Sequence, residues 1–232
     1  MSSGVHPRGH PIQLSARLST ILAGVLVAIA AANVWPPLLI SLRALPGAII
    51  EIAFLAGFIW WARGGGPPQA MHAARIKAFR RIRLSTREMS WGVLAALSFA
   101  VTVHASIVLL FRFILYPTAA FRQGYDLSFI PSPEMRWLAV VMSASSAAIC
   151  EETGFRGFLQ QPIESRYSVP IAVLTLSLLF TALHLTKSWA LLGMVPIVFG
   201  AGVLLGLIAW SAQSLIPGMI GHFVMDVGLF AY

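Results

Sequence analysis

The sequence from residue 137 reads Trp137-Leu-Ala-Val-Val-Met-Ser-Ala-Ser-Ser-Ala-Ala-Ile-Cys150-Glu151-Glu152-Thr-Gly-Phe-Arg156-Gly-Phe-Leu159. Two adjacent glutamates and an arginine thus interrupt a run that is otherwise apolar or small. Neighbouring residues of a helix point about 100° apart, so Glu151 is free to face a different cavity from Glu152. Glu152 and Arg156 are four residues apart and can pair, which lowers the cost of burying both charges.

The composition around this stretch indicates a protein whose solvent is lipid. The chain has 232 residues, of which 10% are charged and 58% are hydrophobic, and its mean hydropathy is +0.81. A soluble domain has about 25% charged and 45–50% apolar residues, so an ordinary soluble domain and a disordered chain are both excluded. The single cysteine, Cys150, excludes an intrachain disulfide and a cysteine cluster for zinc.

Seven apolar segments are long enough, or nearly long enough, to cross a bilayer, for which about 20 residues are needed. They are residues 19–42, 47–62, 89–116, 136–161, 169–186, 191–210 and 214–231. The second has only sixteen residues and is either a re-entrant piece or a short helix. We therefore predict an all-α fold, a polytopic integral membrane helix bundle of about seven transmembrane helices. It forms one integrated membrane domain, with N-terminal helices over 1–135 and a helical core over 136–232.

The cations predict the orientation of the bundle. Seven of the sixteen lie in the segment 63–88, which beside apolar segments indicates a basic cytoplasmic loop rather than a nucleic-acid-binding surface. With a cytoplasmic N-terminus, the inner side holds Arg8, Arg17, these seven and Arg166, and the outer side holds Arg43, Arg122 and Lys187. This bias favours a cytoplasmic N-terminus in the plasma (inner) membrane. Residues 70–83 are either a basic helix on the anionic leaflet or a solvated loop.

Ionisable side chains inside membrane helices are functional candidates, because each costs about 2.5–3.5 kcal/mol at the helix centre. Arg112, Glu51 and His104 have structural or interfacial interpretations. Two further segments carry polar residues with helical spacing, namely Phe180-Thr-Ala-Leu-His184 and His222-Phe-Val-Met-Asp226. With 1.5 Å per residue, Glu151, His184, His222 and Asp226 lie about 15, 22, 12 and 18 Å from the inner helix ends. The four side chains therefore share one layer of the bilayer.

Several functions fit such a layer. A buried carboxylate can act as a general base, and histidines can donate hydrogen bonds to an oxyanion. One glutamate and two histidines can also hold zinc. The same residues can form a proton or ion pathway, or a structural polar core. The residues alone favour catalysis and transport about equally.

The three motifs together resemble the CPBP family, the group of CAAX proteases and bacteriocin-processing proteins also called ABI. Its pattern is EExxxR, FxxxH and HxxxN or HxxxD on three membrane helices, matched here by Glu151–Arg156, Phe180–His184 and His222–Asp226. The family includes the type II CAAX prenyl endopeptidases. The resemblance covers about residues 136–230. It implies that residues 136–232 form the catalytic core of a glutamate-type intramembrane endopeptidase.

The resemblance also implies roles for the matching residues. Glu151 activates a water against a peptide carbonyl with the help of His184, and His222 and Asp226 bind and polarise that carbonyl. Glu152, Arg156 and Phe180 support them. An ionised Asp226 cannot donate a hydrogen bond, so it is either protonated or orients His222. No cofactor is expected, and zinc is a minority alternative.

The expected partners are the lipid bilayer and a membrane-embedded protein or peptide substrate, with lipid-modified substrates included, and no nucleic acid. Two other functions stay open beside the protease. One is a proton-linked membrane transporter that uses the same acids. The other is a non-catalytic immunity or scaffold protein of the same fold.

Overall fold

The computed structural model describes residues 21–26, 29–30, 45–80, 82–113, 127–185 and 192–230. Every regular element in these ranges is helical, and an isolated antiparallel β-bridge joins Arg80 to Ser214. Three of the described helices, α2, α4 and α9, are long and apolar enough to cross a membrane. The protein is an all-α membrane helix bundle, as its composition predicts.

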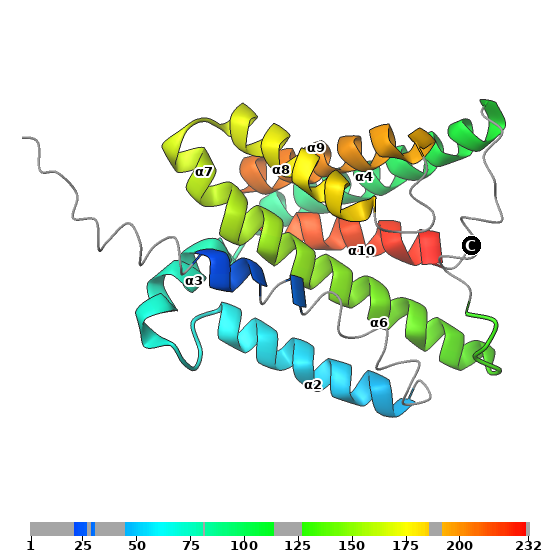
Figure 1. Ribbon diagram of the computed structural model, residues 1–232, viewed down its shortest axis with the longest axis horizontal. Coiled ribbons are helices and arrows are strands. Elements are labelled where there is room, and N and C mark those ends of the chain that lie inside the picture. The colour runs from blue at the N-terminus through cyan, green and yellow to red at the C-terminus, as the bar shows by residue number, and fades with distance from the viewer. Residues whose placement is uncertain are drawn as a thin grey trace, which may run out of the picture.

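The bundle is built from long helices with few intervening turns (Figure 1). The helices are α2 (Leu45–Ala62), α3 (His72–Ala78), α4 (Thr86–Phe113), α6 (Pro133–Glu151), α7 (Gln161–Arg166), α8 (Val169–His184), α9 (Val195–Ala212) and α10 (Ile216–Phe230). Short 3₁₀ turns at Gln69–Met71 and Leu192–Met194 precede α3 and α9. Residues Glu152–Gln160 continue α6 as a π-helix, which we call the π segment, and it leads directly into α7.

Six of the seven predicted segments correspond to helices of the structure, with shifts of a few residues at their ends. The segment 47–62 is the 18-residue helix α2, which is long and apolar enough to span. The segment 136–161 starts earlier, at Pro133, and its helical run continues through the π segment and α7 to Arg166. Of the segment 19–42, residues 21–26 and 29–30 are helical and the others lie outside the described residues.

Local signals explain where the helices begin. A capping box precedes α4, because the Ser85 N–H donates to Glu88 Oε2 at 2.7 Å and the Glu88 N–H donates to Ser85 Oγ at 3.3 Å. Ser132 caps α6 by accepting from the Met135 N–H, and Pro133 follows in the first turn. A proline in the first turn has no N–H to leave unpaired, which makes it a suitable start for a helix.

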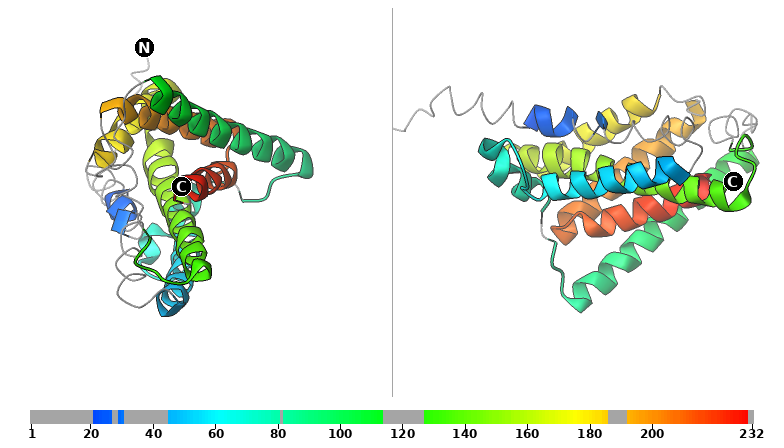
Figure 2. Two further views of the ribbon diagram at one scale, coloured as in Figure 1. Left: turned by 90° about the vertical axis from the view of Figure 1, so that its right-hand side faces the viewer. Right: turned by 90° about the horizontal axis from the view of Figure 1, so that it is seen from below.

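Helix α10 lies in the interior of the bundle. It packs against α4, α6 and α9, and Figure 2 shows it between α4 and α6. Glycines allow this close packing, because a Cβ at Gly221 would lie 3.2 Å from the Ala96 backbone of α4. Helix α2 packs on the other side of α6, and α8 packs against α9. The residues of α6 and α10 are thereby brought together near the centre.

The outer surface is apolar, as a lipid-facing surface must be. Large hydrophobic side chains on α4, α6 and α8 are more than half exposed, among them Trp91, Val101, Val108, Trp137 and Leu178. The interior holds a cluster of Phe99, Phe155, Phe180, Val198, Leu205 and Met225 with their neighbours, contributed by α4, the π segment, α8, α9 and α10. Since large exposed apolar surfaces are rare on soluble monomers, this distribution fits an integral membrane protein.

The basic segment 63–88 contains a buried arginine. The Arg75 side chain is fully buried and donates to the carbonyls of Gly65 at 2.8 Å and Gly66 at 2.9 Å. Its guanidinium carbon also lies 4.8 Å from the centre of the Trp61 ring. One of the seven cations of this segment therefore holds the turn after α2 in place, and α3 is a short helix packed on the bundle.

Candidate active site

The change from α-helix to π-helix falls between the two adjacent glutamates. Glu151 is the last residue of α6, and Glu152 is the first residue of the π segment. Eight of the nine π residues are buried, and Leu159 is the exception. π-helical turns are rare and are frequent at functional sites, so this one directs attention to the residues around it.

Glu152 is the buried anchor of the site. Its side chain has no exposed surface, and Oε1 lies 3.1 Å from the Arg156 guanidinium, which confirms the predicted pair. The same oxygen accepts a hydrogen bond of 2.9 Å from Nδ1 of His222 on α10. Glu152 thus joins the π segment to α10 through a contact between two residues that are 70 positions apart in the sequence.

His222 lies between three carboxylates. While its Nδ1 contacts Glu152, its Nε2 lies 3.9 Å from Glu151 Oε2 and 3.6 Å from Asp226 Oδ2. Both of these distances exceed a direct hydrogen bond. The predicted i, i+4 relationship between His222 and Asp226 is confirmed as a shared face of α10.

The two glutamates point apart, as their offset on the helix predicts, but they reach opposite edges of one imidazole ring. Glu151 and Glu152 therefore share His222 as a neighbour. The two carboxylates differ in exposure, at 21% for Glu151 and 0% for Glu152. Within the described residues, Glu151 Oε2 has no hydrogen-bond partner. Glu151 is therefore the more exposed of the two carboxylates, although its Oε2 atom is itself buried.

Phe180 of α8 lies beside this cluster, and His184 packs on the Phe180 ring. The Phe180 ring centre is 4.3 Å from the His184 ring and 6.2 Å from the His222 ring. The Arg156 guanidinium carbon lies 4.7 Å from the centre of the same Phe180 ring. Since the i+4 spacing brings Nδ1 of His184 within 2.8 Å of the Phe180 carbonyl, Nδ1 donates there and Nε2 carries the lone pair. Phe180 connects the two histidines.

The structure also reveals a buried acid that the sequence did not assign to any partner. Glu51 of α2 is buried, and the Ser146 hydroxyl of α6 donates to its Oε1. Ser146 lies in a stretch of small residues, Ser143 to Ala148, and such residues let a neighbouring helix approach closely. An acid inside an apolar segment was the signal available for Glu51, but no local spacing identified Ser146 as its partner.

A glycine of α10 leaves room for the buried glutamate. A Cβ at Gly218 would lie 3.1 Å from Glu152 Oε2, tighter than most contacts of this kind. His104, by contrast, has the structural role expected for it, because its Nδ1 lies 2.8 Å from the Ala100 carbonyl of its own helix.

The cluster around His222 provides one imidazole and three carboxylates. In the part of the chain that the structure describes, no three His, Cys, Asp or Glu side chains form a group that could hold a metal ion. A carboxylate with an unpaired oxygen beside an oriented imidazole is an arrangement suited to general acid–base chemistry.

Comparison with known proteins adds one finding. Residues 133–228 match the model of a family described as "Type II CAAX prenyl endopeptidase Rce1-like". The match extends from the first turn of α6 into α10 and contains Glu151, Glu152, Arg156, Phe180, His184, His222 and Asp226. No curated protein and no solved structure matches the chain.

Proposed function

Since the C-terminal part of this integral membrane protein, residues 133–228, belongs to the Rce1-like family of type II CAAX prenyl endopeptidases, we propose that it cleaves peptide bonds within the membrane. The family is one of CAAX-type intramembrane proteases. The proposal for this chain depends most on one observation. His222 is held by Glu152 at Nδ1, while its Nε2 faces the more exposed Glu151.

In the proposed reaction, Glu151 is the general base. Its carboxylate, on the more exposed side chain of the two glutamates, accepts a proton from a water molecule while the water oxygen attacks the carbonyl carbon of the substrate. The new C–O bond forms as the carbonyl double bond breaks, which leaves an oxyanion. Glu151 then returns the proton to the amide nitrogen as the C–N bond breaks, so that an acid and an amine are released.

The neighbouring side chains prepare this step. Glu152 fixes the His222 ring from its Nδ1 edge, so Nε2 is directed toward Glu151 and Asp226. The surrounding carboxylates stabilise a positive charge on this ring, and in that form Nε2 donates to the oxyanion. Asp226 orients His222, and His184 assists the water, with Nε2 as the acceptor.

The substrate is a membrane-associated protein or peptide, because the proposed site lies on helices inside the bundle and the surface around it is apolar. The catalytic core is the region 136–232, and the basic segment 63–88 is cytoplasmic in the proposed orientation. No cofactor is needed for the reaction as written.

The test uses the purified full chain in liposomes. A farnesylated peptide ending in a CAAX sequence and its unprenylated counterpart are offered, and the products are identified by mass spectrometry. We expect cleavage by the wild type and its loss in His222→Ala and His184→Ala. Exposed Glu134, at the start of α6, supplies the control variant Glu134→Gln, which should retain activity.

The two peptides separate a prenyl-dependent activity from a general one. If neither peptide is cleaved, membrane proteomes from cells with and without the protein are compared for new C-termini. Substrate-dependent proton flux without any cleavage would contradict the proposal and favour the transporter. If cells that carry His222→Ala or His184→Ala behave like cells with the wild-type protein, the non-catalytic immunity or scaffold function would be favoured.

A further inference from the structure

Arg80, in the basic segment after α3, has a backbone conformation that a non-glycine residue rarely adopts. Its φ is 58°, in the left-handed region, and its backbone forms the isolated bridge with Ser214. Such a conformation persists only where the surrounding contacts determine it. The contacts of Arg80 therefore indicate a role in holding parts of the bundle together.

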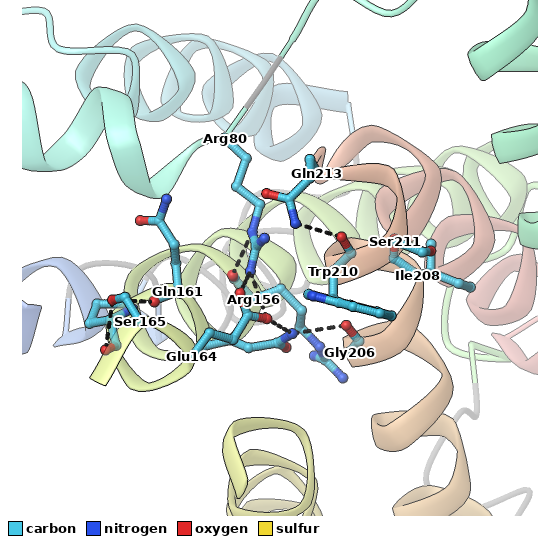
Figure 3. A network of polar contacts seen from close by, with 12 residues as sticks. Arg80, Arg156, Gln161, Glu164, Ser165, Gly206, Ile208, Trp210, Ser211 and Gln213 are labelled. Carbon is cyan, nitrogen blue, oxygen red and sulfur yellow. Dashed lines mark hydrogen bonds and ion pairs between the residues drawn. The ribbon is translucent and has the colours of Figure 1, made fainter. Parts of the chain in front are cut away.

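The side chain of Arg80 extends into the bundle and is only 2% exposed (Figure 3). Its Nε donates to the Arg156 carbonyl of the π segment at 3.2 Å. Its terminal nitrogen lies 3.1 Å from both carboxylate oxygens of Glu164 on α7. A planar guanidinium can satisfy both partners at once, whereas the single ammonium of lysine cannot do so with the same geometry.

The contacts of Arg80 continue to another helix. Glu164 Oε1 also accepts from Gln160 Nε2 at 2.6 Å, and the same amide nitrogen contacts the Gly206 carbonyl of α9 at 2.8 Å (Figure 3). Gln160 is the last residue of the π segment and is buried. The polar network therefore connects the segment after α3 with the π segment, α7 and α9.

The close packing of α3 on the π segment depends on a glycine beside Arg156. A Cβ at Gly157 would lie 2.5 Å from the Ala78 carbonyl oxygen of α3, which real Cβ atoms essentially never do. It would also lie 3.4 Å from Leu215, which precedes α10. Contacts from the segment around Arg80 thus meet the π segment at Arg156 and at the next residue, Gly157.

The backbone of Arg80 reaches the second helix of the site. Its bridge partner Ser214 is fully buried in the turn between α9 and α10. Gln213 in this turn has a φ of 48°, so the backbone on both sides of the bridge is in an unusual conformation. Helix α10 begins two residues after Ser214 and carries His222 and Asp226.

We propose that Arg80 is a positioning residue, which fixes the π segment of Glu152 and Arg156 relative to the start of α10. The Arg80 side chain holds the π segment, and the Arg80 backbone holds the turn that leads into α10. This inference rests on the proposed function, because the contacts that Arg80 maintains are those of Glu151 and Glu152 with His222. Arg80 does not itself touch a reacting atom.

The test measures activity and local structure separately in the full chain. The variants are Arg80→Gln and Arg80→Lys, and the control is Arg83→Gln, which changes an exposed arginine of the same segment. For Arg80→Gln we expect kcat to fall about 10- to 100-fold with KM changed less than about twofold, because small misplacements of catalytic groups have effects of this size. Arg80→Lys should recover only part of kcat, and Arg83→Gln should match the wild type.

Hydrogen exchange is measured without substrate, so it does not depend on the proposed activity. We expect faster exchange at the amides of residues 152–160 in Arg80→Gln, with no change in α4 at residues 95–107. A wild type that cleaves nothing would overturn the proposed function, whereas the exchange result would still report on Arg80. Unchanged exchange at 152–160, or equal changes in kcat for Arg80→Gln and Arg83→Gln, would overturn the positioning role.

Discussion

His222 Nδ1 and Glu152 Oε1 lie 2.9 Å apart and join α10 to the π segment inside the membrane bundle. The same glutamate oxygen lies 3.1 Å from the Arg156 guanidinium, so one buried carboxylate binds both the arginine and the histidine. Because the opposite edge of the ring faces Glu151 and Asp226, the position of Glu152 determines where Nε2 of His222 lies. The chemistry proposed for this protein depends on that arrangement.

Replacing Glu152 should damage stability as well as activity. In Glu152→Gln, Arg156 keeps its buried charge but loses its ionic partner, and removal of one member of a buried pair costs about 3–5 kcal/mol. We expect a lower unfolding temperature in detergent and loss of cleavage. Restoring neutrality with Glu152→Gln and Arg156→Met together should recover stability but not activity. Equal unfolding temperatures for Glu152→Gln and the wild type would show that the pair does not stabilise the fold.

Gly157→Ala tests the close approach of α3 to the π segment. The added methyl would overlap the Ala78 carbonyl oxygen, and such overpacking costs about 1–3 kcal/mol. The matched control is Gly200→Ala in α9, where the methyl would meet no atom within 4 Å. Alanine is the better helix former by up to about 1 kcal/mol, so the control should be neutral or stabilising.

Thermal unfolding of the two glycine variants in the same detergent decides between these expectations. A decrease in the unfolding temperature for Gly157→Ala alone is the predicted result. Equal effects at the two positions would mean that the approach of α3 is not restricted by space.

Ser146→Ala tests the contact between α2 and α6. The substitution leaves the buried Glu51 carboxyl without its hydroxyl donor, and an unsatisfied buried polar group costs about 1–3 kcal/mol. Ser145→Ala is the control, because the Ser145 hydroxyl bonds the Val141 carbonyl of its own helix and lies at the exposed side. The unfolding temperature is the measurement.

A double variant distinguishes loss of the hydrogen bond to Glu51 from loss of the Ser146 hydroxyl as such. In Glu51→Leu combined with Ser146→Ala, neither partner of the hydrogen bond is present, so the loss should be smaller than in Ser146→Ala alone. Additive losses in the single and double variants would argue against coupling between the two side chains.

The candidate site was predictable because polar residues are conspicuous in a membrane sequence. Glu151, Glu152, Arg156, His222 and Asp226 were selected by their position in apolar segments and by i, i+4 spacing, and the structure brings all five together. Both the spacing and the membrane context are local properties of the sequence. Most boundaries of the six described helices that match predicted segments follow from the same apolar runs.

Contacts between distant segments were not predictable in this way. Nothing near Glu152 indicates that His222 will meet it, since the contact depends on how α10 packs on α6. Hydropathy patterns do not reveal the π-helical turn, because the small change in helical winding over Glu152–Gln160 leaves no mark in the order of apolar and polar residues. Arg80 gave no signal either, since an arginine among arginines does not indicate a left-handed backbone or a buried side chain.

If Glu151 is the base of a peptidase, the cleavage rate must depend on its carboxylate, which the Glu151→Gln variant removes. Wild type, Glu151→Gln and Glu134→Gln are compared in liposomes on one substrate, with circular dichroism and unfolding temperature as checks of folding. A positioned general base contributes about 10²- to 10⁴-fold to a rate, so the account predicts at least about a 100-fold loss of kcat in Glu151→Gln and wild-type activity in Glu134→Gln. A folded Glu151→Gln variant that cleaves at the wild-type rate would contradict it.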